Sequence, residues 1–255
     1  MNIGISRPSW EERDSEQIFR LAHEYKFDGV QIKPQQYEPL GLDAERFKEQ
    51  YGDLAYLARG GIIVYPGSSY RTWAERFSSF LSFAKGVGGK QICICAGVRE
   101  RDLDSDGLKG FSGVLNELGR QANGAGAVIS LHNHADTILE SIDDIKRIFE
   151  HIDPACCGLT FDTAHAAKGG IEDLAGALEQ FKPFVNNIHL KDLSGDGKFC
   201  LLGRGTLDLK SVLHKLSEWD YREWLIVDEE TAGVSVREAF AGSAAFLREG
   251  GLLGS

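Results

Sequence analysis

The stretch Leu159-Thr160-Phe161-Asp162-Thr163-Ala164-His165 begins as an apolar run typical of a β-strand and ends with a carboxylate and an imidazole three residues apart. Three other segments have the same form: Ile129–His134, Ile188–Asp192 and Leu225–Glu230. In each of them, polar side chains follow a short apolar run at the point where a strand is expected to end. Since the carboxyl ends of parallel strands meet at the same edge of a sheet, we expect these side chains to lie close together.

The alternation of short apolar runs with longer amphipathic segments extends over the whole chain. It predicts an α/β fold in which crossover helices cover a parallel sheet. Strands are expected at Asn2–Ser6, Gly29–Lys33, Ile62–Tyr65, Lys90–Ala96, Ala127–His132, Cys157–Phe161, Val185–Leu190 and Trp224–Val227. Helices are expected at Glu16–Tyr25, Asp43–Ala58, Arg71–Lys85, Leu108–Asn123, Ser141–His151, Ile171–Phe181, Leu209–Glu218 and Val234–Leu247. Eight strands and eight helices in alternation predict a single (β/α)8 TIM barrel, with residues 1–255 in one domain.

The composition is that of an ordinary globular protein, with 42% hydrophobic and 26% charged residues. A formal net charge of −10 argues against a nucleic-acid binder. No apolar run approaches the ~20 residues that cross a bilayer, and Met1–Arg7 lacks the apolar core of a signal peptide. Five cysteines without Cys-x-x-Cys spacing indicate reduced thiols. We therefore expect a cytoplasmic protein that binds neither nucleic acid nor membrane; a homo-oligomer stays open.

Imidazoles and carboxylates follow the last four expected strands: His132, His134, Asp162, His189, Asp228 and Glu230. Side chains two residues apart on a strand share one face, so His132 and His134 should point the same way. The same holds for Asp228 and Glu230. Nitrogen and oxygen ligands together suit Mn²⁺, Zn²⁺, Co²⁺ or Fe²⁺ better than Ca²⁺. Such an ion would polarise a substrate carbonyl or hydroxyl, while a nearby carboxylate or histidine moves a proton.

Each of these residues also has a purely structural interpretation. A lone histidine at a strand end is more often a hydrogen-bonded structural group than a ligand. Asp162 is also suited to capping the loop that follows it, and Asp228-Glu229-Glu230 has the composition of a solvated acidic run. The coincidence at the ends of four consecutive strands favours the functional interpretation.

At these residues the chain resembles the xylose-isomerase-like barrels of the sugar phosphate isomerase/epimerase type. The resemblance covers nearly the whole chain and is most specific in Phe161–His165, Ile188–Asp192 and Leu202–Asp208. Leu131–Ser141 is similar to the Glu-Asn-His segment of that family and the helix start after it. The family includes ketose 3-epimerases, hydroxypyruvate isomerases, inosose dehydratases and endonuclease IV.

The resemblance implies that Asp162 and His189 bind one divalent ion (Mn, Zn, Co or Fe, with Mg also admissible). The remaining ligands would come from the fifth and eighth strands, where this chain has His132 and Asp228 in place of the family's two glutamates. The expected catalytic residues are Asp228, Glu230, His132 and His165. The expected substrate-binding residues are His134, His165, Lys191, Arg204, Lys33 and Trp10, the last two as pocket walls together with Gln31.

These substitutions bear on the reaction. A symmetrical epimerisation needs a base on each face of the carbon, and His132 stands where the family has one of its two carboxylates. The leading prediction is an isomerase or epimerase that removes a proton next to the carbonyl of a small sugar or polyol derivative. The alternatives are a dehydratase or lyase of the same family and a non-catalytic sugar-binding barrel. An abasic-site endonuclease is disfavoured, because it needs more metal ligands and a basic surface.

Overall fold

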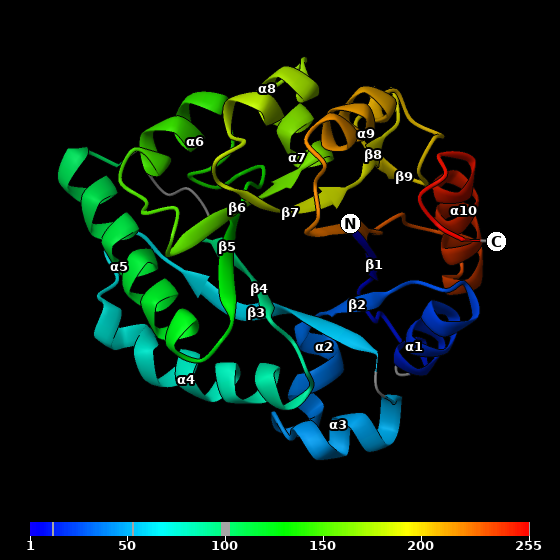
Figure 1. Cartoon of the computed structure of the whole chain (residues 1–255), viewed down its shortest axis with the longest axis horizontal. Coiled ribbons are helices and arrows are strands. Elements are labelled where there is room, and N and C mark those ends of the chain that lie inside the picture. Colours follow the sequence, from blue (N-terminus) through cyan, green and yellow to red (C-terminus); the bar gives the residue numbers. More distant parts are fainter. Residues whose placement is uncertain (12, 53, 98–102, 255) are drawn as a thin grey trace.

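The computed structural model describes residues 1–11, 13–52, 54–97 and 103–254, and within them eight parallel strands close into a barrel (Figure 1). These strands are β1 (Asn2–Ser6), β2 (Gly29–Ile32), β3 (Ala55–Val64), β4 (Gln91–Ala96), β5 (Val128–His132), β6 (Cys157–Asp162), β7 (Val185–Leu190) and β10 (Trp224–Asp228). The barrel closes because β1 pairs with β2 on one side and with β10 on the other. The predicted α/β TIM barrel is confirmed, and the single domain stays a prediction.

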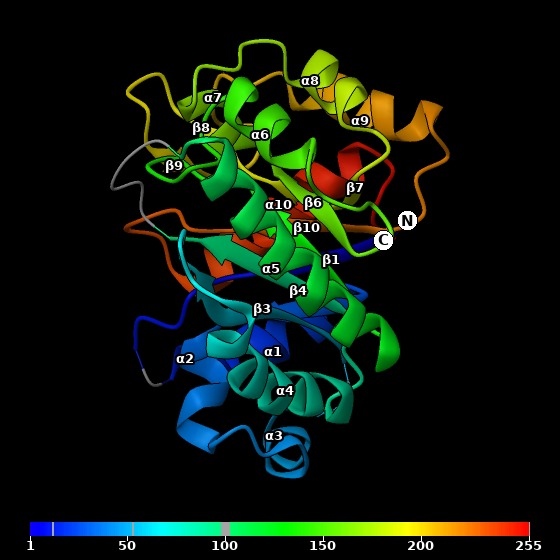
Figure 2. The same ribbon diagram turned by 90° about the vertical axis from the view of Figure 1, so that its left-hand side faces the viewer.

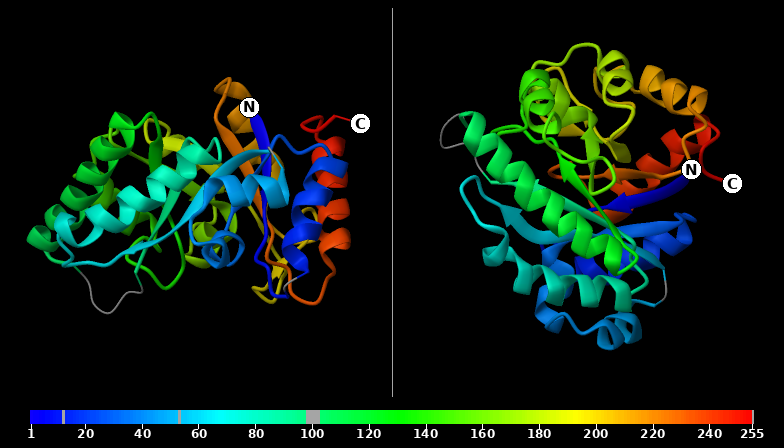
Figure 3. Two further views of the ribbon diagram at one scale, coloured as in Figure 1. Left: turned by 90° about the horizontal axis from the view of Figure 1, so that it is seen from below. Right: turned by 60° about the vertical axis from the view of Figure 1, so that its left-hand side comes forward.

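Helices surround this barrel, as the views from two directions show (Figures 1 and 2). They are α1 (Asp14–Glu24), α2 (Pro34–Tyr37), α3 (Ala44–Tyr51), α4 (Tyr70–Gly86), α5 (Ser105–Gly124), α6 (Ile142–Phe149), α7 (Thr163–Lys168), α8 (Leu174–Gln180), α9 (Leu209–Glu218) and α10 (Val236–Glu249), with a 3-10 turn at Glu38–Leu40. The last helix packs beside the first, so the two ends of the chain lie near each other (Figure 3). Across the described ranges, no helix combines the length and the apolar character needed to cross a bilayer.

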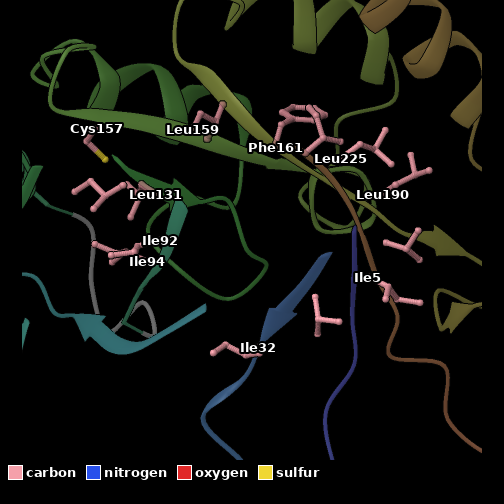
Figure 4. Close-up of a cluster of buried hydrophobic side chains, with 14 of the residues drawn as sticks. Ile5, Ile32, Ile92, Ile94, Leu131, Cys157, Leu159, Phe161, Leu190 and Leu225 are labelled. Carbon is pink, nitrogen blue, oxygen red and sulfur yellow. The ribbon is translucent and has the colours of Figure 1, made fainter. Parts of the chain in front are cut away.

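Alternation along the strands separates an apolar layer from a polar one. Buried apolar side chains such as Ile32, Leu131 and Leu159 form part of the hydrophobic core (Figure 4). The polar residues Ser130 and Thr160, each next to one of these leucines in sequence, are hydrogen-bonded to each other inside the barrel. Asn187 of β7 reaches Gln31 of β2, although these two strands are not adjacent. Polar side chains therefore fill the inside of the barrel up to the carboxyl ends of the strands, where the site described below lies.

The prediction for residues 43–58 is wrong in its second half, because helix α3 ends at Tyr51 and β3 begins at Ala55. Gly52 ends the helix with a positive φ of 82°. The buried Tyr56 then donates its hydroxyl to the carbonyls of Tyr51 and Gly52, at 2.9 and 2.6 Å, which fixes the turn into the strand. The other predicted helices agree with the structure to within three residues at each end.

Five short elements were not predicted: α2, the 3-10 turn, α7, and the strands β8 (Asp192–Leu193) and β9 (Phe199–Cys200). Helix α7 begins directly after Asp162, where a loop was expected. The loop that joins β7 to α9 contains β8 and β9, which pair antiparallel. The Asp192 carboxylate accepts hydrogen bonds from the backbone N–H groups of Gly203 and Gly205, both at 3.0 Å. This loop is therefore tied back to the end of β7 and lies over the mouth of the barrel.

Candidate metal centre

Three potential metal ligands converge at the ends of three adjacent strands, β5, β6 and β7. The Nε2 atom of His132 lies 3.3 Å from Oδ2 of Asp162, and Nδ1 of His189 lies 3.6 Å from the same oxygen. The three ligand atoms all lie within 4.8 Å of one another, and the side chains are fully buried. Bonds of 2.0–2.2 Å in a tetrahedral site hold the ligand atoms about 3.4 Å apart. The spacing therefore suits one divalent ion.

The environment of His189 fixes which nitrogen carries its proton. Its Nε2 lies 3.1 Å from Oε1 of Gln31, a carbonyl oxygen that only accepts, so Nε2 is the donor. The lone pair on Nδ1 then faces the carboxylates, and this buried atom has no hydrogen-bond partner within the described residues. Burial, with His132 nearby, lowers the pKa of His189 to about 4, so the ring is neutral at pH 7. A neutral imidazole with an available lone pair is the form that binds a metal.

The second histidine has a neighbour that was not predicted. The Nδ1 atom of His132 lies 3.6 Å from the Cys95 sulfur, while its Nε2 faces Asp162. With an ion on Nε2, the proton sits on Nδ1 and points to the thiol sulfur. Cys95 is one of the five cysteines that the sequence predicts to be reduced thiols, and in the structure it is a thiol. Its contact depends on the register between β4 and β5, in which Cys95 lies beside His132.

Asp162 uses both of its carboxylate oxygens. Its Oδ1 accepts a hydrogen bond from the backbone N–H of His165 at 2.8 Å and caps helix α7, while Oδ2 faces the two histidines. Burial of this carboxyl opposes ionisation, but nearby positive charge, with Lys191 the largest contribution, outweighs it. The pKa of Asp162 is therefore held well below its usual range. The capping interpretation of Asp162 is therefore confirmed, and its second oxygen stays available to a metal, as the ligand interpretation predicts.

A ring of four alternating charges adjoins these ligands: Lys33, Asp228, Lys191 and Glu230, here called the lysine–carboxylate ring. Each lysine Nζ lies 2.8 Å from one oxygen of Asp228. Glu230 receives Lys33 at 2.6 Å on one oxygen and Lys191 at 2.9 Å on the other. Asp228 also approaches the triad, since its Oδ2 lies 3.7 Å from Nδ1 of His189. The acidic run is therefore buried at Asp228 and is not solvated there.

Lys191 is held in its charged form. Burial opposes its charge, but Asp228, Asp162 and Glu230 together outweigh burial and raise the pKa of Lys191. Its Nζ lies 3.8 Å from Oδ2 of Asp162, so the ammonium stands between the ligands and Glu230. At neutral pH this residue is a charged hydrogen-bond donor and not a base.

A second group of rings covers the other side of the site. His165 stacks on His134 with 3.6 Å between ring centroids, and the Phe199 ring lies 5.3 Å away. The backbone N–H of Ala135 donates to Nδ1 of His165 at 3.3 Å, which leaves Nε2–H as a donor. Burial lowers the pKa of His165 to about 2, so it is neutral and serves as a hydrogen-bond donor. Phe199 was not predicted, because a single aromatic residue in a glycine-rich loop gives no signal in the sequence.

An open pocket of about 420 Å³ lies against this region, lined by Pro8, Trp10, Lys33, Pro34, Gln35, Phe199 and Glu230. The structure thus places Trp10 and Lys33 at a pocket wall. Gln31 lies instead beneath the site, bonded to His189. Arg204 is exposed, and within the described part of the chain no side-chain contact joins it to the site.

A family model described as a xylose isomerase-like TIM barrel matches residues 19–250 of this chain. The chain is 30% identical over 143 residues to inosose dehydratase from Geobacillus kaustophilus, covering 49% of this chain and 44% of that protein. It is 29% identical over 134 residues to inosose dehydratase from Clostridium tetani, covering 46% of this chain and 45% of that protein. The chain spans about half the length of the curated relatives it matches.

Solved structures with the same fold cover almost the whole chain. The 3-keto-D-glucoside 4-epimerase YcjR from E. coli is 21% identical with a TM-score of 0.74, over 98% of this chain and 99% of that one. D-allulose 3-epimerase from Methylomonas sp., in complex with D-allulose, is 15% identical with a TM-score of 0.78, over 98% and 96%. The IolI protein with a bound zinc atom is 17% identical with a TM-score of 0.74, over 98% and 97%. At these identities the likeness shows the fold alone.

Proposed function

The chain belongs to the xylose isomerase-like TIM barrel family, and we propose that it is a divalent-metal-dependent enzyme acting on a small sugar or polyol derivative. The reaction begins with removal of a proton next to a substrate carbonyl. The observation that carries the proposal is the convergence of His132 Nε2, Asp162 Oδ2 and His189 Nδ1 within 4.8 Å, with the lone pair of His189 turned to the carboxylates. Asp228 is the fourth ligand in this proposal, since it lies 3.7 Å from His189.

The bound ion supplies Lewis-acid polarisation of the substrate carbonyl. The residues of the chain do the rest. Neutral His165 donates its Nε2–H to a substrate oxygen, and the ammonium of Lys191 donates a proton or a hydrogen bond. The carboxylates at the end of β10, Asp228 and Glu230, are the groups that accept the proton from carbon. Trp10 and Phe199 form apolar walls for the carbon chain.

The arrangement favours a reaction that needs a base on only one face, and we propose dehydration first. One carboxylate takes the proton from the carbon next to the carbonyl, the bond to the neighbouring hydroxyl breaks, and Lys191 protonates the departing hydroxide to water. The other face offers His132, but its Nε2 faces Asp162 and its Nδ1 faces Cys95. An epimerase would need a second base at that position. The inosose dehydratases among the relatives support placing dehydration before epimerisation.

A one-base isomerisation is the second candidate. In that reaction the carboxylate that removed the proton returns it to the neighbouring carbon on the same face, so the arrangement around His132 is no obstacle. The pair of carboxylates from β10, Asp228 and Glu230, supports it as well as dehydration.

The first experiment is metal content by plasma mass spectrometry, on protein purified without chelator or His tag. About one equivalent of Mn, Zn, Co or Fe is expected in the wild type and in His214→Ala, whose histidine is exposed on α9. His189→Ala should lose the metal. If neither the wild type nor the control binds an ion after soaking, the metal-dependent reaction is wrong.

The second experiment follows the reaction in D2O with a panel of ketoses, inososes and keto sugar acids. Loss of one water identifies a dehydratase, and deuterium uptake with an isomeric product identifies an isomerase. A protein that binds metal but produces neither change is a non-catalytic sugar-binding barrel.

A further inference from the structure

Glu230 occupies a place that a substrate must enter. Together with Lys33 and Phe199 it lines the pocket, whereas His132, Asp162 and His189 are fully buried and do not line it. Lys191 connects the two regions, because its Nζ lies 2.9 Å from Glu230 and 3.8 Å from Asp162. A molecule in the pocket therefore meets Glu230 before it meets the metal ligands.

The two carboxylates of the lysine–carboxylate ring differ in how firmly they are held. Asp228 is wholly buried and lies at the end of a barrel strand. The Glu230 side chain is 23% exposed and follows the strand by two residues, outside it. Both make the same contacts with the lysines, one oxygen to each. Glu230 is therefore the member of the ring that is able to move aside.

Moving Glu230 aside takes one carboxylate from each lysine: Lys33 keeps Asp228, and Lys191 keeps Asp228 and, at 3.8 Å, Asp162. Lys33 and Lys191 are each only 3% exposed, so water does not replace the lost partner well. Losing one of the carboxylates that face a buried ammonium is unfavourable, and a neutral hydroxyl compensates for that loss poorly. The molecule that takes the place of Glu230 must therefore bring a negative charge of its own, with two oxygens spaced to meet two lysines.

We propose that Glu230 holds the place of a substrate carboxylate, which binds between Lys33 and Lys191 and displaces it. The substrate class is then a sugar acid or another polyhydroxy carboxylic acid, and not a neutral sugar. This inference rests on the proposed function for the chemistry of the site, in which Asp228 is the base once Glu230 is displaced. The binding of the carboxylate itself does not depend on that function. The walls formed by Trp10 and Phe199 hold the carbon chain beside the carboxylate.

The test is calorimetric binding to metal-free protein of two matched probes, D-gluconate and D-glucitol, which differ in one carboxylate. Gluconate should bind at least about ten-fold more tightly than glucitol, since only it replaces the charge of Glu230. Glu230→Gln should tighten gluconate binding by about ten-fold, because the internal competitor loses its charge. The partly exposed Glu230 tolerates this isosteric change. Lys33→Gln, checked for folding by circular dichroism, should reduce the preference for gluconate.

A matched control is Lys168→Gln. The Nζ atom of Lys168 lies 4.0 Å from the centre of the Phe199 side-chain ring, so Lys168 is close to the pocket. It does not contact Asp228 or Glu230 as Lys33 and Lys191 do, so its substitution should not change gluconate binding. Equal affinity for the two probes, or weaker gluconate binding in Glu230→Gln, would overturn the proposal. So would tighter binding of inorganic phosphate than of gluconate. These measurements need neither metal nor turnover, so their failure is distinguishable from failure of the metal-dependent reaction.

Discussion

Asp162 serves the fold with one oxygen and the proposed metal with the other, and the two roles are separable by substitution. In Asp162→Asn the amide oxygen still accepts the hydrogen bond from the His165 backbone that caps α7. The substitution removes the negative charge that faces His132 and His189. We expect Asp162→Asn to lose bound metal and also to lower the unfolding free energy of the metal-free protein at pH 7, because the lowered pKa of Asp162 means that its ionised form stabilises the fold.

Asp162→Ala is the comparison that isolates the cap. It removes the cap as well as the charge, so it should lose metal and be about 1 kcal/mol less stable than Asp162→Asn. Plasma mass spectrometry and urea unfolding of the same preparations check both. A full equivalent of metal in Asp162→Asn would contradict the assignment of Asp162 as a ligand.

Individual site residues differ in how far the sequence could predict them. His132, Asp162 and His189 lie together because parallel strands end at one edge, a property of the pattern alone. Phe199 reaches the site because β9 pairs with β8 and the Asp192 carboxylate binds the backbone of the loop that follows. No local sequence pattern indicates this arrangement. Alternation places Gln31 on the inside of the barrel, but the sequence does not predict its hydrogen bond to His189, because the two residues come from strands far apart in the chain.

The end of strand β10 shows how alternation assigns neighbouring acids to different environments. Asp228 and Glu230 contact the two site lysines, whereas Glu229 between them forms a buried ion pair with Arg7 after the end of β1. Burial lowers the pKa of Arg7, although Asp14 and Glu230 counteract this. Glu229→Gln leaves Arg7 buried without its partner. We expect it to cost roughly 3–5 kcal/mol of unfolding free energy and to leave metal content unchanged.

The double variant Arg7→Met, Glu229→Leu provides the control for that substitution. Replacing both charges with apolar side chains of similar volume removes the unpaired charge, so most of the lost stability should return. Urea unfolding of the three proteins measures this. Loss of metal in Glu229→Gln, with a folded protein, would show that Glu229 and not Asp228 faces the site.

The errors in predicting elements have identifiable causes. The sequence around Gly60-Gly61 suggests a helix end, but both glycines lie inside β3, where the pairing with β4 shifts register between Arg59 and Ile63. Glycine at a strand irregularity and glycine after a helix look the same in sequence. Helix α7 is six residues long, too short for a helical period to be recognised. The closed barrel itself follows from alternation over the whole chain.

Two of the buried imidazoles, those of His165 and His189, are neutral in the folded protein, so the stability of the molecule should depend on pH. The folded pKa values are about 4 for His189 and about 2 for His165, below the usual value of 6.5. As the pH falls below about 6.5, the unfolded chain therefore takes up protons that the folded chain does not. Stability is fully present above that pH and falls below it, for His189 until about pH 4. Between pH 7.5 and 5.5 the two histidines together should remove about 3 kcal/mol from the metal-free protein.

Urea unfolding of metal-free protein at these two pH values measures the loss, and His165→Gln should reduce it by about half. His214→Gln should leave it unchanged, because that side chain is exposed in the folded and unfolded states alike. A stability that does not fall over this range would mean that the buried rings are charged in the folded protein. Charged imidazoles have no lone pair for a metal, so the same result would also remove His189 as a ligand. If they are neutral, a bound ion should add the same stability at both pH values, because a ring with a folded pKa of about 4 takes up no competing proton in this range.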